Sequence, residues 1–181
     1  MSVAPTPRLL PIEEVNRLDR DRFTRALGPL FEAADPLADR LFAERPFRSY
    51  EALLDRAAEV VGRMTPEERV AVVDAHPRIG EDAGVVRATS ALSYKEQGYD
   101  AEAGLDAADL ERLYATLGEL NRRYEERHGF GFVVFVNRRP KSEIVDVLRE
   151  RFNNGREQEL ATALGEMLSI ARDRLATLGG S

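Results

Sequence analysis

Two histidines and no cysteine limit the proton chemistry that this chain of 181 residues can perform. His76 stands in the segment Ala75-His76-Pro77-Arg78-Ile79-Gly80. Imidazole has an ordinary pKa of about 6.5, so it can both give and take a proton near neutrality. Pro77 and Gly80 predict a rigid, sharply turned loop that could hold the imidazole still. A histidine at a helix end is also commonly structural, because its cation suits the helix dipole, and spacing alone favours that interpretation.

Ser93, Glu96 and Gln97 form a second candidate group. Ser-x-x-Glu is the pattern of a capping box, in which the serine caps a helix and the glutamate bonds back to the cap's amide. This pattern therefore predicts a helix that begins at Ser93. A helix start also presents free amides to an anion. In a compatible functional interpretation, Glu96 or Gln97 faces a ligand that Ser93 hydrogen-bonds.

Taken alone, Arg174 and the stretch 130–137 are each better explained by a structural role than by a functional one. Arg174 lies in a helical pattern, where most arginines face solvent. The stretch 130–137 is apolar and rich in β-branched residues, which is typical of a core segment. His128 precedes Gly129 and is interpreted as a helix-end residue. The two histidines form no His-x-x-x-His pair, so we expect no metal site.

The elements that position these residues are expected to be helices. Asp19 or Asp21, Ser49, Thr65 and Asp106 are the expected helix starts, and Gly129 is an expected stop. A single strand at 130–137 would lack a partner, so that stretch is expected to be an extended buried connector. We predict an all-α bundle of about seven or eight helices, with a flexible arm at 1–10 and a single domain at 11–181. The expected helices cover about 19–34, 36–42, 49–61, 65–76, 93–97, 106–129, 141–153 and 156–178, with a loop at 78–92.

The composition excludes several classes of protein. The net charge is −6, and the arginines are scattered among acidic residues, so we expect no nucleic-acid partner. The apolar run 133–136 is far too short to span a bilayer, and we expect no membrane partner. The absence of cysteine excludes disulfides, thiol nucleophiles and cysteine-bound metals. Neither end of the chain carries a targeting pattern, so a cytoplasmic location is expected.

An ordered set of short motifs runs through most of the chain, from about Phe42 to Leu178. Each motif is weak, but together and in this order they resemble 2-oxo-4-hydroxy-4-carboxy-5-ureidoimidazoline (OHCU) decarboxylase, a family of urate breakdown. The motifs are His76-Pro77-x-Ile79-Gly80, Ser93-x-x-Glu96-Gln97, Ala103-Gly104-Leu105, Tyr124-x-x-x-x-Gly129-Phe130-x-Phe132, Glu159-Leu160 and Arg174-Leu175.

This resemblance implies an all-helical, cofactor-free enzyme, typically a homodimer, that converts OHCU to (S)-allantoin and CO2. It implies that His76 is catalytic. Glu96, in the substrate-contacting Ser-x-x-Glu-Gln motif, is expected to join the catalysis either by setting the protonation of His76 or by bonding the substrate. The substrate contacts that the resemblance implies fall on Pro77, Ser93, Gln97, Phe132, Val133, Val134, Phe135, Val136 and Arg174, with the segment after Phe130 acting largely through its main chain.

Two departures from the family's pattern put loop geometry in doubt. Gly131 stands where the family commonly has proline, and the stretch 98–103 is longer than usual. Two alternatives stay open from the sequence. One is a non-catalytic helical interaction module, and the other is a related lyase that acts on another purine-derived ring.

Overall fold

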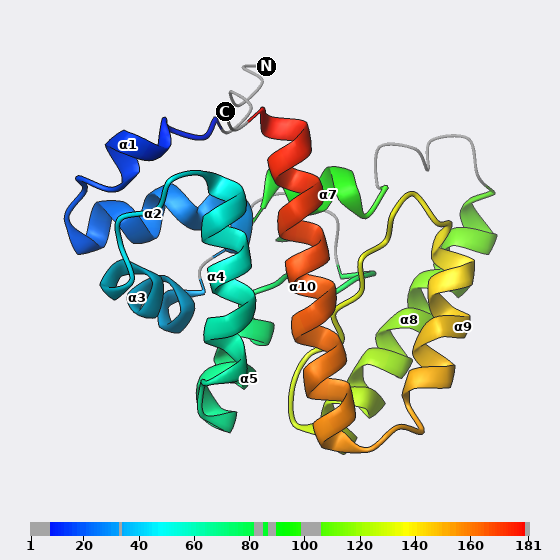
Figure 1. Ribbon diagram of the computed structural model, residues 1–181. Coiled ribbons are helices and arrows are strands. Elements are labelled where there is room, and N and C mark those ends of the chain that lie inside the picture. The colour runs from blue at the N-terminus through cyan, green and yellow to red at the C-terminus, as the bar shows by residue number, and fades with distance from the viewer. Residues whose placement is uncertain (1–7, 33, 82–84, 87–89, 99–105, 180–181) are drawn as a thin grey trace. The chain divides into compact units, whose positions relative to one another are not determined.

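The computed structural model describes residues 8–32, 34–81, 85–86, 90–98 and 106–179, and these ranges contain helices but no strand (Figure 1). The predicted all-α class is confirmed. The described ranges hold nine labelled helices, against the seven or eight predicted. They are α1 (Ile12–Val15), α2 (Arg20–Phe31), α3 (Asp35–Ala43), α4 (Tyr50–Gly62), α5 (Pro66–Asp74), α7 (Ala91–Glu96), α8 (Ala107–His128), α9 (Lys141–Arg151) and α10 (Arg156–Leu178).

The chain divides into two compact units. The first comprises Met1–Ala75 and Leu168–Ser181, and the second comprises His76–Met167. Helices α1 to α5 and the C-terminal end of α10 belong to the first unit. Helices α7, α8, α9 and the first half of α10 belong to the second, which also contains every predicted site residue except Arg174.

Polar caps begin the helices of the first unit where the sequence predicts them. The Asp19 side chain accepts a hydrogen bond from the amide of Arg22 at the start of α2, and Ser49 caps α4. Thr65 and Glu68 form both bonds of a capping box on α5. Helix α2 ends at Phe31, short of the predicted Ala34. Buried apolar residues of α2, α3 and α4, among them Phe23, Leu27, Leu37, Leu41, Leu53 and Leu54, build this unit's core.

Helix α8 and the segment that follows it form the frame of the second unit. Asp106 caps α8 through the amides of Ala108 and Asp109, and Gly129 ends it in the left-handed conformation at φ 78°, as predicted. Residues 130–136 then return from the end of α8 toward the start of α9 as coil (Figure 1). All of them are buried except Phe135, which is half-buried, so the prediction of a buried connector without strand partners is confirmed for 130–136. Asn137, the last residue of the predicted stretch, is exposed and lies in a turn.

The structure corrects the predicted start of α7. The predicted capping box at Ser93 and Glu96 is wrong, because the helix begins at Ala91 and its cap is Ser90, whose Oγ accepts the Ser93 amide at 3.1 Å. Two serines three residues apart offer two registers, and the earlier one is adopted. Ser93 is therefore a buried residue inside the helix.

Other differences are smaller. Helix α1 was not predicted. Of the predicted arm at 1–10, residues 1–7 lie outside the described residues, as do residues 99–103 of the longer stretch. The division into an arm and a single domain stays a prediction. None of the helices in the described ranges has the length and apolar character needed to cross a membrane.

Candidate active site

The His-Pro loop begins directly after α5. His76 is the second residue beyond Asp74, and 9% of its surface is exposed, so the protein surrounds the imidazole. The next residue, Pro77, accepts a hydrogen bond through its carbonyl from the Gln97 Nε2 at 3.4 Å. This bond joins the loop to the C-terminal end of α7. Residues 20 positions apart in the sequence are thus neighbours, as the functional interpretation requires.

One face of α8 holds the loop after Pro77. The Asn121 Nδ2 donates to the carbonyl of Ile79 at 2.8 Å, and the Arg78 guanidinium pairs with the Glu125 carboxylate. Residues four apart on a helix lie on the same face. The bonds from Asn121 and Glu125 therefore fix two successive parts of the loop to a single rigid helix.

Gly80 completes this attachment and requires the absence of a side chain. Its φ is +77°, in the left-handed region that favours glycine. A Cβ at this position would come within 2.8 Å of the Leu117 Cβ and Cδ1. Leu117 lies four residues before Asn121, so the same face of α8 packs directly against the turn.

Helix α7 supplies the second group of predicted site residues. Ser93 and Gln97, four residues apart, are both buried, and Glu96 is half-buried. The Lys141 Nζ donates to the Gln97 carbonyl at 2.6 Å, which places a buried cation at the C-terminal end of α7. A cation there stabilises the helix through its dipole. The Gln97 Oε1 has no hydrogen-bond partner in the described parts of the chain and is an available acceptor.

Charged side chains hold the main chain of the connector 130–136. The Arg151 Nη1 donates to the Val133 carbonyl at 2.9 Å, and the Glu166 Oε2 accepts the Phe135 amide at 2.5 Å. Arg139 donates to the Phe135 carbonyl at 2.7 Å and to the Val136 carbonyl at 3.1 Å. The connector is therefore fixed without a neighbouring strand.

A buried carboxylate, that of Glu159, lies behind the connector. Glu159 is 0% exposed and accepts bonds from the Tyr124 hydroxyl at 2.5 Å, the Arg151 Nε at 2.9 Å and the Asn154 Nδ2 at 2.8 Å. Burial, together with the bond to Glu159, raises the pKa of the Tyr124 hydroxyl well above its usual range. The Tyr124 ring packs edge-on against Phe132, with centroids 5.2 Å apart. The network thereby links α8, α9 and α10 to the connector.

Arg174 belongs to the first unit, unlike the other predicted site residues. Its side chain is 1% exposed, and its Nη2 lies 2.7 Å from the Glu32 carboxylate. Its Nη1 also donates to the carbonyl of Pro29 at 3.4 Å. The guanidinium thus carries an acidic partner of its own unit, and a substrate contact for Arg174 stays a prediction.

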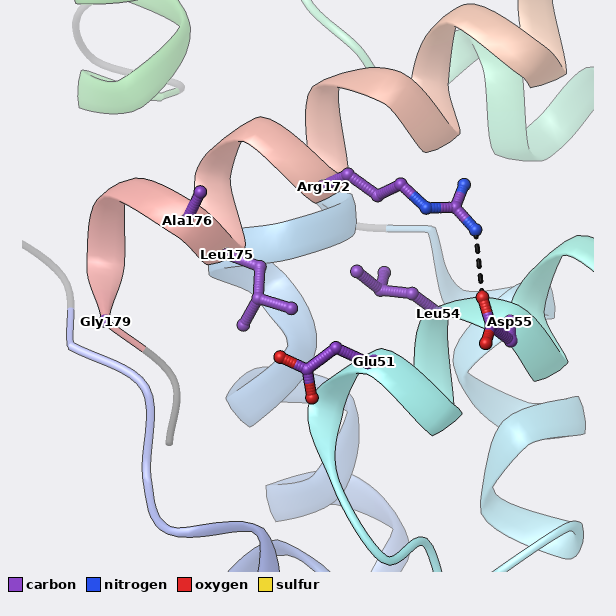
Figure 2. A pocket seen from close by; sticks show the side chains of 7 residues that line it. All are labelled: Glu51, Leu54, Asp55, Arg172, Leu175, Ala176 and Gly179. Carbon is purple, nitrogen blue, oxygen red and sulfur yellow. Dashed lines mark hydrogen bonds and ion pairs between the residues drawn. The ribbon is translucent and has the colours of Figure 1, made fainter.

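A surface groove of about 410 Å³ lies between α4 and the end of α10 in the first unit (Figure 2). Figure 2 shows Arg172 reaching across it to Asp55, with 3.1 Å between Nη2 and Oδ1. The groove contains none of the predicted site residues. Its lining is Glu51, Leu54, Asp55, Arg172, Leu175, Ala176 and Gly179.

Sequence reasoning missed the residues that support the site. Asn121 interrupts the apolar face of α8 between Leu117 and Tyr124, and a polar residue at such a position signals a buried hydrogen bond. Glu159 and Tyr124 stand in the motif set, but nothing in the sequence pairs them. Lys141, Arg151 and Glu166 carry no local signal, because charged residues on helices usually face solvent.

The arrangement in the second unit suits proton transfer to a small polar ligand. One buried imidazole, one half-buried carboxylate, a hydroxyl and an amide are carried by a loop and a short helix that hydrogen-bond each other. No group of three or more His, Asp or Glu side chains in the described ranges could hold a metal ion. Hydrogen bonding and acid–base catalysis are the chemistry that these side chains offer.

Comparisons with known proteins agree on one family. The sequence model of the OHCU decarboxylase family matches residues 16–176. A 2-oxo-4-hydroxy-4-carboxy-5-ureidoimidazoline decarboxylase from Haloferax volcanii is 34% identical over 167 residues, which are 92% of this chain and 95% of that protein. A crystal structure of OHCU decarboxylase in the presence of (S)-allantoin aligns with a TM-score of 0.60 at 26% identity, covering 78% of this chain and 89% of that one.

A second solved structure supports the fold alone. The crystal structure of (S)-allantoin synthase aligns with a TM-score of 0.63 at 20% identity and covers 93% of this chain. The alignment spans 54% of that longer chain.

Proposed function

The chain belongs to the OHCU decarboxylase family, and on that premise we propose that it converts OHCU to (S)-allantoin and CO2 in urate breakdown. The observation that supports this activity most strongly is the bond from Gln97 to the Pro77 carbonyl. It brings the two chemistry-bearing motifs of the sequence together in the second unit.

The reaction needs a proton carrier and an electron sink. OHCU carries a carboxylate and a hydroxyl on one ring carbon, next to a carbon joined to nitrogen by a double bond. When the bond to CO2 breaks, its electron pair forms a carbon–carbon double bond, and the C=N electrons move to the nitrogen. That nitrogen takes up a proton from solvent, loss of the hydroxyl proton forms a carbonyl, and a proton arrives at the ureido carbon on one face. No external oxidant or reductant is needed.

His76 is the group proposed to move these protons. Its imidazole accepts the hydroxyl proton and, once protonated, returns a proton, which is the role of a general acid–base group. Pro77 and the bonds from α8 hold the loop, so the imidazole has little freedom to turn away. A proton carrier fixed on one side of the ring accounts for a single product enantiomer.

The residues of α7 are proposed to orient the substrate. Glu96 either sets the protonation of His76 or bonds the substrate and crowds its carboxylate. Ser93 and Gln97 bond the ring and ureido groups, and the unbonded Gln97 Oε1 is suited to accept from a ureido N–H. Desolvation by such a buried site raises the energy of the carboxylate relative to a transition state with dispersed charge.

The connector and Arg174 complete the proposed contacts. Main-chain groups between Phe132 and Val136 bond one ring edge, and the apolar side chains keep water out. Arg174 offers a planar fork of donors to a carboxylate or carbonyl of the substrate. A homodimer, which the resemblance implies, and a cytoplasmic location are also proposed. Sedimentation of the 20.3-kDa chain at twice its mass would support the dimer.

The stereochemistry of the product tests the proposed activity. Freshly generated OHCU decays spontaneously to racemic allantoin, so the purified chain should yield optically active (S)-allantoin together with CO2. The measurement is polarimetry of the product against a buffer control. A racemic product formed at the buffer rate would contradict the proposal, and would leave a non-catalytic helical module or a lyase for another ring as the explanation.

A further inference from the structure

We infer that Glu166 and Arg151 are positioning residues of the reaction, which fix one edge of the connector so that its other edge meets the substrate. The inference rests on the proposed function, since it assigns how the main chain of 132–136 is held for that contact. Neither residue is proposed to touch the substrate.

From Phe132 to Phe135 the connector's hydrogen bonds fall on alternate residues, and at its end the Val136 carbonyl accepts from Arg139. Arg151 bonds the carbonyl of Val133 and Glu166 bonds the amide of Phe135. Val134 lies between these two residues, and Phe132 precedes Val133. Neither Val134 nor Phe132 makes a main-chain hydrogen bond to any residue of the described ranges. In extended backbone, the N–H and C=O of one residue point to the same edge, and those of the next residue to the other edge. The protein therefore occupies the edge at Val133 and Phe135 and leaves the edge at Phe132 and Val134 for a ligand.

Buried main-chain groups need hydrogen-bond partners, so the unoccupied edge of the connector is expected to bind a ligand. Phe132 and Val134 are only 2% and 7% exposed. Nearly all buried amides and carbonyls in proteins are paired with protein, water or ligand. An edge that offers one amide N–H and one carbonyl at the same residue matches a planar ring with adjacent donor and acceptor atoms.

The two positioning residues come from helices whose own packing fixes them. The Arg151 side chain is 10% exposed, bonds Glu159 through Nε and lies over the Phe132 ring at 4.6 Å. Glu166 stands on α10, seven residues after Glu159 and therefore on nearly the same face of that helix. Charge-assisted bonds from such side chains are short and stronger than neutral ones, so they can set the connector's position closely.

Glu166 gives the cleaner test, because it is half-buried and its loss leaves an amide that water can reach. Glu166→Ala removes the acceptor, whereas Glu166→Gln keeps an oxygen that can accept the Phe135 amide. Glu157→Ala is the matched control, since Glu157 is an exposed glutamate of the same helix. Arg151→Lys keeps the positive charge beside Glu159. A lysine lacks the planar fork of donors with which Arg151 bonds Glu159 and the Val133 carbonyl at the same time.

The readouts are steady-state turnover of OHCU and hydrogen exchange of the peptide that covers 130–139. We expect Glu166→Ala and Arg151→Lys to raise KM about tenfold with kcat changed by less than about threefold, as for the loss of an interaction present in both ground and transition states. Exchange in 130–139 should accelerate, while Glu166→Gln and Glu157→Ala should match the parent within about twofold in both readouts.

The outcomes separate this inference from the proposed function. An inactive parent chain contradicts the proposed function itself. An active parent with an unchanged KM in Glu166→Ala, despite faster exchange in 130–139, overturns the positioning role and leaves the activity intact. The same holds if Glu166→Gln fails to restore KM while it restores slow exchange.

Discussion

The setting of His76 is built from small, exacting contacts at the next four residues. The Pro77 carbonyl accepts a hydrogen bond from the Gln97 side chain, and the Ile79 carbonyl accepts one from Asn121. Gly80 adopts a left-handed φ of +77° where it packs against Leu117. Of these residues, Gly80 is the least replaceable, because the turn requires its left-handed backbone conformation and Leu117 leaves no room for a Cβ. The sequence indicated a turn here, but the close approach of Leu117 depends on a helix 37 positions away and has no local signal.

Gly80→Ala should therefore disturb the loop that carries His76. The added Cβ would lie 2.8 Å from two atoms of Leu117, and alanine is strained at this φ. We expect a loss of about 1–3 kcal/mol in the free energy of unfolding and a clear fall in kcat/KM. Urea unfolding and turnover of OHCU measure the two effects. Gly165→Ala is a suitable control, since a Cβ there meets nothing within 4 Å.

Helix α8 is the element that unites the parts of the site. One face of this helix holds the His-Pro loop through Leu117, Asn121 and Glu125, and Tyr124 meets the connector. The bounds of α8 were predictable, because Asp106 and Gly129 are clear start and stop residues. Its polar partners were not, because pairs such as Asn121 with Ile79 or Tyr124 with Glu159 are set by tertiary packing.

Asn121→Ala should weaken the attachment between α8 and the loop. It leaves the buried carbonyl of Ile79 without its donor, which costs about 1–3 kcal/mol in the free energy of unfolding. Thermal or urea unfolding measures this loss against Glu126→Ala, an exposed site on the same helix. Equal stability of the two variants would show that the bond to Ile79 does not hold the loop.

Helix α7 illustrates how a correct motif can give a wrong element boundary. Ser93-x-x-Glu96 satisfies the capping-box pattern, yet Ser90 is the cap and Ser93 is turned into the buried side of the helix. Local sequence does not distinguish the two registers, since both begin with serine. Ser93 is therefore not the cap of α7, and the substrate contact that the family resemblance implies for it stays a prediction.

At the scale of the whole molecule, the buried polar groups make stability depend on pH. His128 is 1% exposed, and burial lowers the pKa of its imidazole below the usual 6.5. The unfolded chain takes up the proton first as pH falls, so the unfolded state binds more protons in that range. The neutral histidine therefore supports the fold above about pH 6.5, and stability falls as pH drops below that value toward the folded pKa.

His128→Phe should flatten this dependence. Phenylalanine can occupy the ring cluster of Tyr124, Phe130 and Phe152 without a titrating group. Between pH 7.5 and 5.5 we expect the parent to lose more unfolding free energy than the variant, by at most about 1.4 kcal/mol per pH unit. Urea unfolding at the two pH values is the measurement, and parallel losses in both proteins would rule out His128 as the source.

The all-helical class and most helix bounds followed from periodicity and caps, whereas the organisation of the chain into two units did not. One break falls between Ala75 and His76, directly before the His-Pro motif, and the other falls inside α10, so neither lies at a linker rich in glycine or proline. The ion pair between Arg174 and Glu32 was equally hidden, because it joins residues 142 positions apart. The candidate site residues were proposed from the sequence, and the partners that support them were found from packing.

The role of His76 is tested most directly by the rate of CO2 release from freshly generated OHCU, measured for the parent chain and for His76→Asn. Asparagine keeps a polar side chain of related shape but cannot transfer the proton, so turnover should fall by about a hundredfold or more, with the helical circular dichroism unchanged. Turnover by His76→Asn within a few-fold of the parent would contradict the account.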